Sequence, residues 1–300
     1  MNSEDHGGDS TGTLNTTQQP EPARAPSRLV PELSDTQHKD VSRRTQPSAV
    51  VVHETVREEG EQELQRAPAA LGWSALAAGL SMGFSLIAQG LIHFYLHGVS
   101  WSPLLDNFGY SVGFLIAVLG RQQLFTENTL TPILPLFANH SLRMLWLTLR
   151  LWTIVLAANL MGAFIFAFIL AHTSLFPGAI QQAFAQVAQN ALRGGFGLTI
   201  LRAIFAGWLI ALMVWLLPAA EGTRLHVIII LTYLVSLGGF AHIIAGSIDV
   251  LYLVNLGAAT WGTYFIGFML PTLIGNIIGG VSLVAALNFA QVASEKIGDD

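Results

Sequence analysis

The chain contains no cysteine among its 300 residues, and it contains few charged residues. The absence of cysteine excludes disulfides and metal sites built from thiolates. Charged residues make up only 11% of the sequence, whereas about a quarter is usual for a soluble domain. Residues 67–300 carry only 7 basic and 7 acidic side chains. This part of the chain is therefore too poor in charge to form the surface of a soluble protein.

The remaining charges are concentrated at the N-terminus. Residues 1–66 carry 7 basic and 12 acidic side chains, which accounts for the whole formal net charge of −5. That charge gives no indication of a nucleic-acid partner, and none is expected. The sequence also lacks a nucleophile–base pair, a cluster of metal ligands and a phosphate-binding glycine loop. We therefore expect no enzymatic activity, no cofactor and no metal.

Long hydrophobic stretches are abundant. Hydrophobic residues make up 52% of the chain, and its mean hydropathy is +0.53. A helix needs roughly 20 apolar residues to cross a hydrocarbon core of about 30 Å. Six stretches are long enough, at about 71–95, 108–137, 144–171, 197–217, 225–254 and 262–290. The sequence therefore predicts an all-α membrane protein with six transmembrane helices, the first of which acts as an uncleaved insertion signal.

Polar residues and glycines interrupt the second and fifth of these stretches. The interruptions are Arg121–Gln123 and Glu127–Asn128 in the second, and Gly238–Gly239, His242, Gly246 and Asp249 in the fifth. Non-helical backbone is tolerated at membrane depth only where it is buried in protein or lines a cavity. Because the interruptions occupy corresponding places in two sets of three, they predict an inverted 3+3 repeat whose broken helices form the solute path. The alternative is a pair of kinks packed against neighbouring helices.

Composition divides the chain into four segments. Residues 1–46 are rich in serine, threonine, proline and glutamine and are predicted to be a disordered acidic tail. Residues 47–68 are predicted to form an amphipathic cytoplasmic helix against the membrane or the protein body, with a solvated acidic helix as the alternative. The pore domain is expected at 69–292, followed by a short cytoplasmic C-terminus at 293–300.

Six spans place both termini on the same side of the membrane. Basic residues near the ends of the spans are distributed unequally between the two sides. The N-terminal side holds Arg57, Arg66, Arg143, Arg224 and Lys296, and the opposite loops hold only Arg193. Since basic residues are retained on the inner side, both termini are predicted to be cytoplasmic.

Four motifs occupy the two interruptions and the later spans. They are LFTENT at 124–129, AGWLIALMVW at 206–215, GFAH at 239–242 and LPTLIGNIIGG at 270–280. In this combination the chain resembles the formate/nitrite transporter family, and within it the YfdC-type branch, over about residues 60–292. The resemblance implies an aquaporin-like protomer with broken second and fifth helices, located in a bacterial inner membrane. It also implies a homopentamer with one pore in each subunit.

The same resemblance implies a function and a set of site residues. Pores of the family pass small monovalent anions such as formate, nitrite or hydrosulfide, and a central histidine can share a proton with the anion. The matching positions are His242 and Thr126 at the pore centre, Phe114, Leu124 and Phe125 at an inner constriction, and Tyr110 and Val235 at an outer constriction.

The chemistry of His242 supports this interpretation independently. An ionisable side chain inside a membrane span is costly and is by default a functional candidate. Histidine titrates near physiological pH, so it can relay a proton, and a neutral acid crosses apolar rings far more cheaply than its anion. The alternative is a core histidine that is bonded to a neighbour.

The chain departs from the family pattern at three polar positions. The family has a lysine before the fourth span, an asparagine within it and a glutamate before the histidine, and this chain has Ala191, Gly207 and Ala241 there. Arg193 lies two residues from the lysine position, although arginine does not replace a lysine point charge equivalently. These losses favour a second hypothesis, in which the pore carries a small neutral solute. A third hypothesis is a membrane scaffold or sensor with a vestigial pore.

The chain has charges of its own within or near the spans. Arg202 and Asp249 are predicted to form a buried ion pair, because each would be costly alone. Glu127 is predicted to pair with Arg121 or Arg150. A structural role is favoured for these five charges over direct contact with the solute.

Overall fold

The helices follow the hydrophobic stretches of the sequence. The computed structural model describes Ser34, Thr36 and residues 47–285, with side chains described to residue 282. Apart from Ser34 and Thr36, the predicted tail at 1–46 lies outside the described residues, as do residues 286–292 and the predicted C-terminus at 293–300. Within residues 47–285 the secondary structure consists of helices only, as the fold prediction required.

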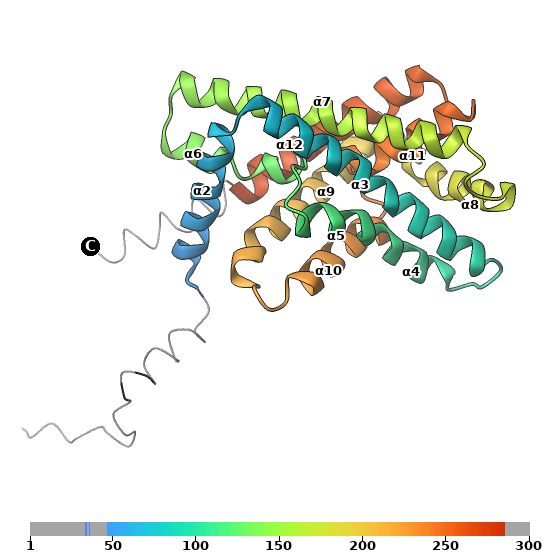
Figure 1. The fold of residues 1–300 in the computed structure, drawn as a ribbon, viewed down its shortest axis with the longest axis horizontal. Helices are drawn as coiled ribbons and strands as arrows, with labels where there is room; N and C mark the ends of the chain where they lie inside the picture. Colours follow the sequence, from blue (N-terminus) through green and yellow to red (C-terminus); the bar gives the residue numbers. More distant parts are fainter. Residues whose placement is uncertain (1–33, 35, 37–46, 286–300) are drawn as a thin grey trace, which may run out of the picture. The chain divides into compact units, whose positions relative to one another are not determined.

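Seventeen helical elements follow one another within residues 47–285, and several are short turns between the long helices. In chain order they are α2 (Ala49–Gln65), α3 (Pro68–Tyr95), α4 (Ser102–Asp106), η1 (Asn107–Tyr110), α5 (Ser111–Leu119), η2 (Glu127–Thr129), α6 (Ile133–Ala138), α7 (Leu142–His172), α8 (Gly178–Ala188), η3 (Gln189–Leu192), α9 (Phe196–Leu216), η4 (Leu217–Ala219), α10 (Arg224–Leu237), α11 (Ile243–Asn255), η5 (Thr263–Met269), α12 (Leu270–Ile278) and η6 (Gly279–Ala285). Figure 1 shows α3 and α7 packed side by side.

Five helical segments in the described part are long and apolar enough to cross a membrane. They are Pro68–Tyr95, Ser102–Leu119, Leu142–His172, Phe196–Ala219 and Thr263–Ser282. The fifth predicted stretch instead consists of α10 and α11, which have 14 and 13 residues. Each is about 20 Å long, which is shorter than a bilayer core of about 30 Å. Five helices rather than six therefore meet the length criterion, because the fifth stretch is divided in two.

The two halves of the described chain repeat the same close helix contact. A Cβ added to Gly79 on α3 would lie 2.2 Å from the carbonyl oxygen of Asn159 on α7. A Cβ added to Gly207 on α9 would lie 2.4 Å from the carbonyl oxygen of Asn276 on α12. Only glycine permits either approach, so α3 with α7 and α9 with α12 are packed in equivalent ways.

A second pair of glycines makes the reciprocal contact. A Cβ on Gly162 of α7 would lie 2.6 Å from the carbonyl oxygen of Leu76 on α3. A Cβ on Gly279 would lie 2.1 Å from the carbonyl oxygen of Ile204 on α9. The contacts support a repeat of three membrane passages, and an odd number of passages inverts the second unit relative to the first.

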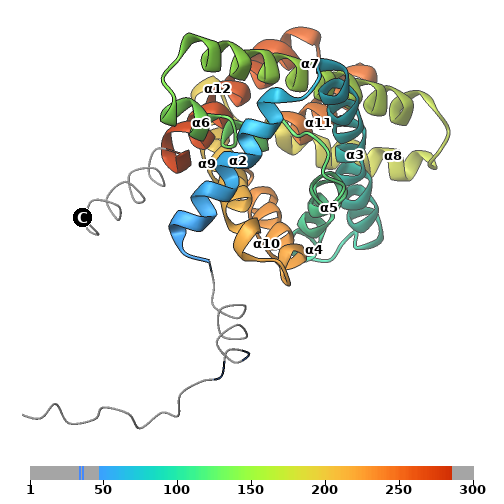
Figure 2. The same ribbon diagram turned by 60° about the vertical axis from the view of Figure 1, so that its left-hand side comes forward.

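Helix α2 lies within the segment predicted to be an amphipathic helix, and it packs against the protein body. It contacts α6, α7 and α9, and in Figure 2 it passes α9 and α6 on its way to the start of α3. A Cβ on Gly60 would lie 2.0 Å from the carbonyl oxygen of Thr131. Arg150 Nη2 donates to the carbonyl oxygens of Leu64 at 2.8 Å and Arg66 at 3.3 Å. These contacts favour docking on the body over a solvated helix.

Candidate functional site: the junction of two helix breaks

Both predicted interruptions are breaks in the helical backbone. After α5 the chain turns at Arg121, whose φ of 51° is in the left-handed region, which non-glycine residues seldom adopt. After α10 it turns at Gly239, whose φ is 62°. The first break continues to η2, and the second ends where His242 caps the N-terminus of α11.

A buried asparagine on α7 holds the first break in place. Asn159 Oδ1 accepts a hydrogen bond from the backbone N–H of Phe125 at 2.9 Å. Its Nδ2 donates to the carbonyl oxygens of Gln123 at 2.9 Å and Ala75 at 2.6 Å. One side chain therefore satisfies the open backbone of the break and joins it to α3.

Asn276 on α12 does the same for the second break. Its Oδ1 accepts from the backbone N–H of Ile243 at 2.9 Å, and its Nδ2 donates to the carbonyl oxygens of Ala241 at 2.9 Å and Ala203 at 2.8 Å. Neither asparagine was predicted to have this role. Asn159 and Asn276 are the only amide side chains in α7 and α12, and this was the available sequence signal.

The two breaks bring Thr126 and His242 into contact. Thr126 Oγ1 and His242 Nε2 are 2.7 Å apart, although 116 residues separate them in sequence. Both side chains are buried, with exposed fractions of 0% and 1%. The predicted pair therefore lies at the junction of the breaks.

The hydrogen bonds of His242 assign the position of its proton. Nδ1 accepts from the backbone N–H groups of Ile244 and Ala245, both at 3.3 Å, so the proton of the neutral ring is on Nε2. Nε2–H then donates to Thr126 Oγ1. A second proton on Nδ1 would break both bonds and place a positive charge at the positive end of α11. The contacts therefore favour a neutral imidazole that acts as a hydrogen-bond donor.

Buried aromatic and aliphatic side chains surround this contact. The ring centroids of Phe114 and His242 are 5.0 Å apart, with an interplanar angle of 73°. The ring centroids of Tyr110 and Phe114 are 5.2 Å apart. The residues predicted for the two constrictions are all buried, namely Tyr110, Phe114, Leu124, Phe125 and Val235. Of these five residues, only Tyr110 lines either of the two cavities described below, and that cavity is the one that reaches His242.

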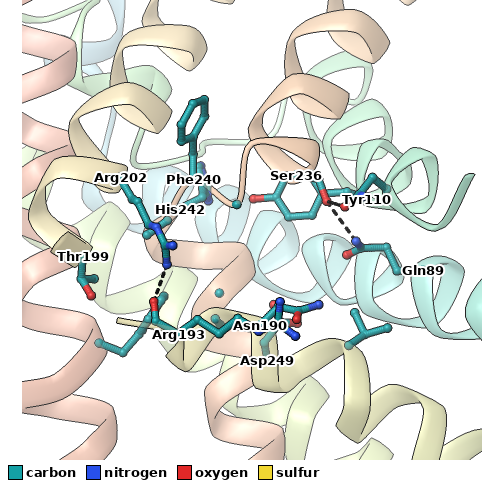
Figure 3. Close-up of a pocket in the computed structure, with 17 residues that line it drawn as sticks. Gln89, Tyr110, Asn190, Arg193, Thr199, Arg202, Ser236, Phe240, His242 and Asp249 are labelled. Atoms are coloured by element: carbon teal, nitrogen blue, oxygen red, sulfur yellow. Dashed lines mark hydrogen bonds between the residues drawn. The ribbon is translucent and has the colours of Figure 1, made fainter. Parts of the chain in front are cut away.

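A cavity of about 80 Å³, here called the histidine cavity, reaches His242 from one side (Figure 3). Its polar lining comes from Gln89, Asn107, Tyr110, Asn190, Arg193, Thr199, Arg202, Ser236, His242 and Asp249. Gln89 Nε2 donates to Ser236 Oγ at 3.0 Å, and Ser236 Oγ donates to Asn107 Oδ1 at 2.5 Å. The cavity therefore provides a small polar chamber beside the histidine.

The predicted ion pair between Arg202 and Asp249 is not formed. Both residues line the histidine cavity, but Arg202 Nη1 donates to the backbone carbonyl of Arg193 (Figure 3). Among the residues that the structure describes, no ion pair within 4.0 Å includes either side chain. The prediction failed because it assumed that both groups were buried, whereas the cavity leaves them accessible.

Glu127 pairs with neither of its predicted partners. Arg121 Nη2 lies 3.9 Å from Glu59 Oε1, and Arg150 donates to backbone carbonyls at the end of α2, that of Leu64 among them. Glu127 Oε1 is buried without a hydrogen bond to any described residue. Both arginines contact α2 instead of Glu127.

A second cavity of about 640 Å³, here called the α2 cavity, lies between α2 and the first break. Its charged lining residues are Glu59, Glu63, Arg66, Arg121, Glu127, Glu221 and Arg224. Glu63 accepts hydrogen bonds from Gln123 Nε2 at 3.0 Å and Thr131 Oγ1 at 2.8 Å. Burial nevertheless raises the pKa of the Glu63 carboxyl above its usual value of 4.5. The two hydrogen bonds connect α2 directly to the first break.

The three positions that depart from the family pattern have different surroundings. Ala191 and Ala241 line the histidine cavity. Gly207 instead packs against the backbone of Asn276, where no side chain fits. An asparagine at position 207 would therefore require α9 and α12 to separate.

Comparisons with known proteins agree with this architecture. The model of the family "Formate/nitrite transporter" matches residues 50–290. The chain is 42% identical over 247 residues to the inner membrane protein YfdC of Escherichia coli, with 82% of this chain and 80% of that protein covered. It is 29% identical over 252 residues to the formate channel BtFdhC of Bacillus thuringiensis, covering 80% and 93%. A solved pentameric formate channel with formate bound has the same fold, with a TM-score of 0.63 and 21% identity over 74% of this chain and 96% of that one.

Proposed function

Because this chain belongs to the formate/nitrite transporter family, we propose that it forms a pore for formate, nitrite or another small monovalent anion, or for the conjugate acid. The pore runs from the histidine cavity, past His242 and Thr126, to the α2 cavity. Phe114, Leu124 and Phe125 form its inner constriction, and Tyr110 and Val235 form its outer one. The proposal places the protein in a bacterial inner membrane with both termini in the cytoplasm.

The contact between Thr126 and His242 carries the proposal. It joins the two helix breaks, it is buried, and it borders a polar chamber of solute size. The Nε2–H group offers a hydrogen bond that a small carboxylic acid or its anion can accept in place of Thr126. Since the ring stays neutral, it lowers the cost of desolvating the solute without trapping it as an ion pair.

Formate uptake into proteoliposomes tests the proposal. We expect His242→Ala to lower the initial rate by about tenfold or more, because it removes the Nε2–H donor that contacts Thr126 and uncaps α11. His242→Asn keeps a side chain whose oxygen can cap α11, so an equal loss in that variant would show that the cap alone does not account for the role of His242. The matched control is His172→Ala, at the exposed end of α7, which should transport as the unchanged protein does. Equal flux in all variants would refute a role for His242.

A pore for a small neutral solute is the second candidate function. The neutral imidazole and the alanines at positions 191 and 241 favour it, because no lysine or glutamate at those positions attracts an anion or tunes the histidine. Stopped-flow swelling of the same vesicles with small neutral solutes, compared with anion flux, separates the two. Swelling without anion flux would favour the neutral solute.

A further inference from the structure

Helix α11 presents a continuous stripe to the histidine cavity. His242, Gly246 and Asp249 all line it, at the i, i+4 and i+7 spacing of one helix face. Figure 3 labels His242 and Asp249 among the lining residues. The middle position has no side chain, since a Cβ on Gly246 would lie 2.4 Å from the ring of Phe268. Asp249 therefore faces the same chamber as His242, about 10 Å further along the helix axis.

The carboxyl group of Asp249 has no hydrogen-bond or ion-pair partner in the described part of the chain. The other charged or titratable residues that line the cavity are Tyr110, Arg193, Arg202 and His242. Arg193 is exposed, and Arg202 is bound to the carbonyl of Arg193. Asp249 is therefore free to exchange a proton with the contents of the cavity.

Elements packed against α11 bring no further titratable group to this cavity. Helices α8 and α12 and the η3 turn contain none. The titratable residues of α3, α7 and η5 do not line it, namely His93, Tyr95, Arg143, Arg150, His172 and Tyr264. Asp249 is thus the one carboxyl group that borders the histidine cavity among the described residues.

We propose that Asp249 is the group that exchanges a proton with the transported anion in the histidine cavity. The proposal rests on the pore function argued above, and it assigns the exchange to a residue other than the central histidine. His242 is poorly suited to it, because its Nδ1 is occupied by two backbone N–H groups at a helix N-terminus. An aspartic acid at the wall of an open cavity has no such restriction.

The step is a simple proton transfer. The guanidinium group of Arg202 attracts the anion into the cavity. The O–H bond of protonated Asp249 breaks, an O–H bond forms on the solute, and Asp249 becomes a carboxylate. The neutral acid then passes His242 and Thr126, and hydronium from the solution on the cavity side reprotonates Asp249. The charged carboxylate repels a second anion until it is reprotonated, which links entry of the solute to uptake of a proton.

Formate uptake at a series of external pH values tests the assignment. The unchanged protein should transport faster as the external pH falls and should alkalinise the outside. Asp249→Asn should lose this pH dependence and at least about tenfold of the rate at low pH. Asp249→Glu should keep the pH dependence. Asp106→Asn, which changes an aspartate bound to His93 outside the cavity, should also keep it. A normal pH profile in Asp249→Asn would overturn the proposal.

Difference infrared spectroscopy of the unchanged protein provides a second readout that does not depend on flux. The C=O stretch of a protonated carboxyl should appear on acidification, respond to added formate and be missing in Asp249→Asn. If no carboxyl band responds to formate, the proposal fails even where the variant does not assemble. If the unchanged protein carries neither formate nor nitrite, the proposed function itself fails, and the assignment of Asp249 fails with it.

Discussion

At the scale of single residues, glycine and asparagine determine how closely the helices approach. Gly207 allows the backbone of α9 to touch the backbone of α12 at Asn276, and Gly79 does the same between α3 and α7. The carbonyl oxygen at each contact belongs to the asparagine that also holds a helix break. Helix packing and the geometry of the site therefore depend on the same four residues.

Gly207→Ala should destabilise the protein by about 1–3 kcal/mol, because its Cβ would overlap a backbone oxygen that cannot move independently. The matched control is Gly197→Ala on the same helix, where an added Cβ meets nothing within 4 Å. The thermal unfolding midpoint in detergent measures the stability of both variants. A midpoint in Gly207→Ala equal to that of the control would contradict the close contact.

At the scale of elements, α2 connects the segment before the first span to the interior of the pore domain. Its Glu63 bonds to Gln123 and Thr131, which flank the LFTENT motif, and Arg150 of α7 binds its C-terminal carbonyls. Within α2, Arg57 is hydrogen-bonded to Glu54, which raises the pKa of the guanidinium further above its usual value. The docked helix is therefore hydrogen-bonded to residues on both sides of Thr126.

Docking of α2 should weaken as the pH rises. Burial raises the pKa of Glu63 above 4.5 in the docked state, so docking binds a proton. The associated stabilisation is complete below 4.5 and is lost as the pH passes through the raised value. Hydrogen-exchange protection of residues 49–65 should fall across that window, and Glu63→Gln should remove the pH dependence. Protection that rises with pH would show the opposite linkage.

At the scale of the whole molecule, the described part of the chain carries many large apolar side chains on its surface. Trp73, Trp146, Ile230 and Ile266 are exposed by 61–72%. A membrane span is expected to present such residues to lipid or to a neighbouring subunit. The outer surface is therefore suited to both contacts.

The family resemblance of the sequence predicts a homopentamer with one pore in each subunit. Native mass spectrometry in a mild detergent should then give a mass five times that of the 32.3 kDa chain. A monomer that still transports formate would show that the pore is complete within one subunit and that the pentamer is not required.

The family resemblance alone implied the pairing of Thr126 with His242, because 116 residues separate the two. The sequence by itself determined the membrane class, the positions of the two breaks and the repeat. These features are local or periodic, because span length, glycine spacing and polar interruptions follow directly from the solubility of a helix in lipid.

Only the tertiary structure decided the partners of the charged residues. Arg202 binds a carbonyl instead of Asp249, and Arg121 and Arg150 contact α2 instead of Glu127. The physical reason is that pairing depends on which groups a cavity leaves accessible and which distant carbonyls come within reach. Neither property is encoded in the spacing of residues along one chain segment.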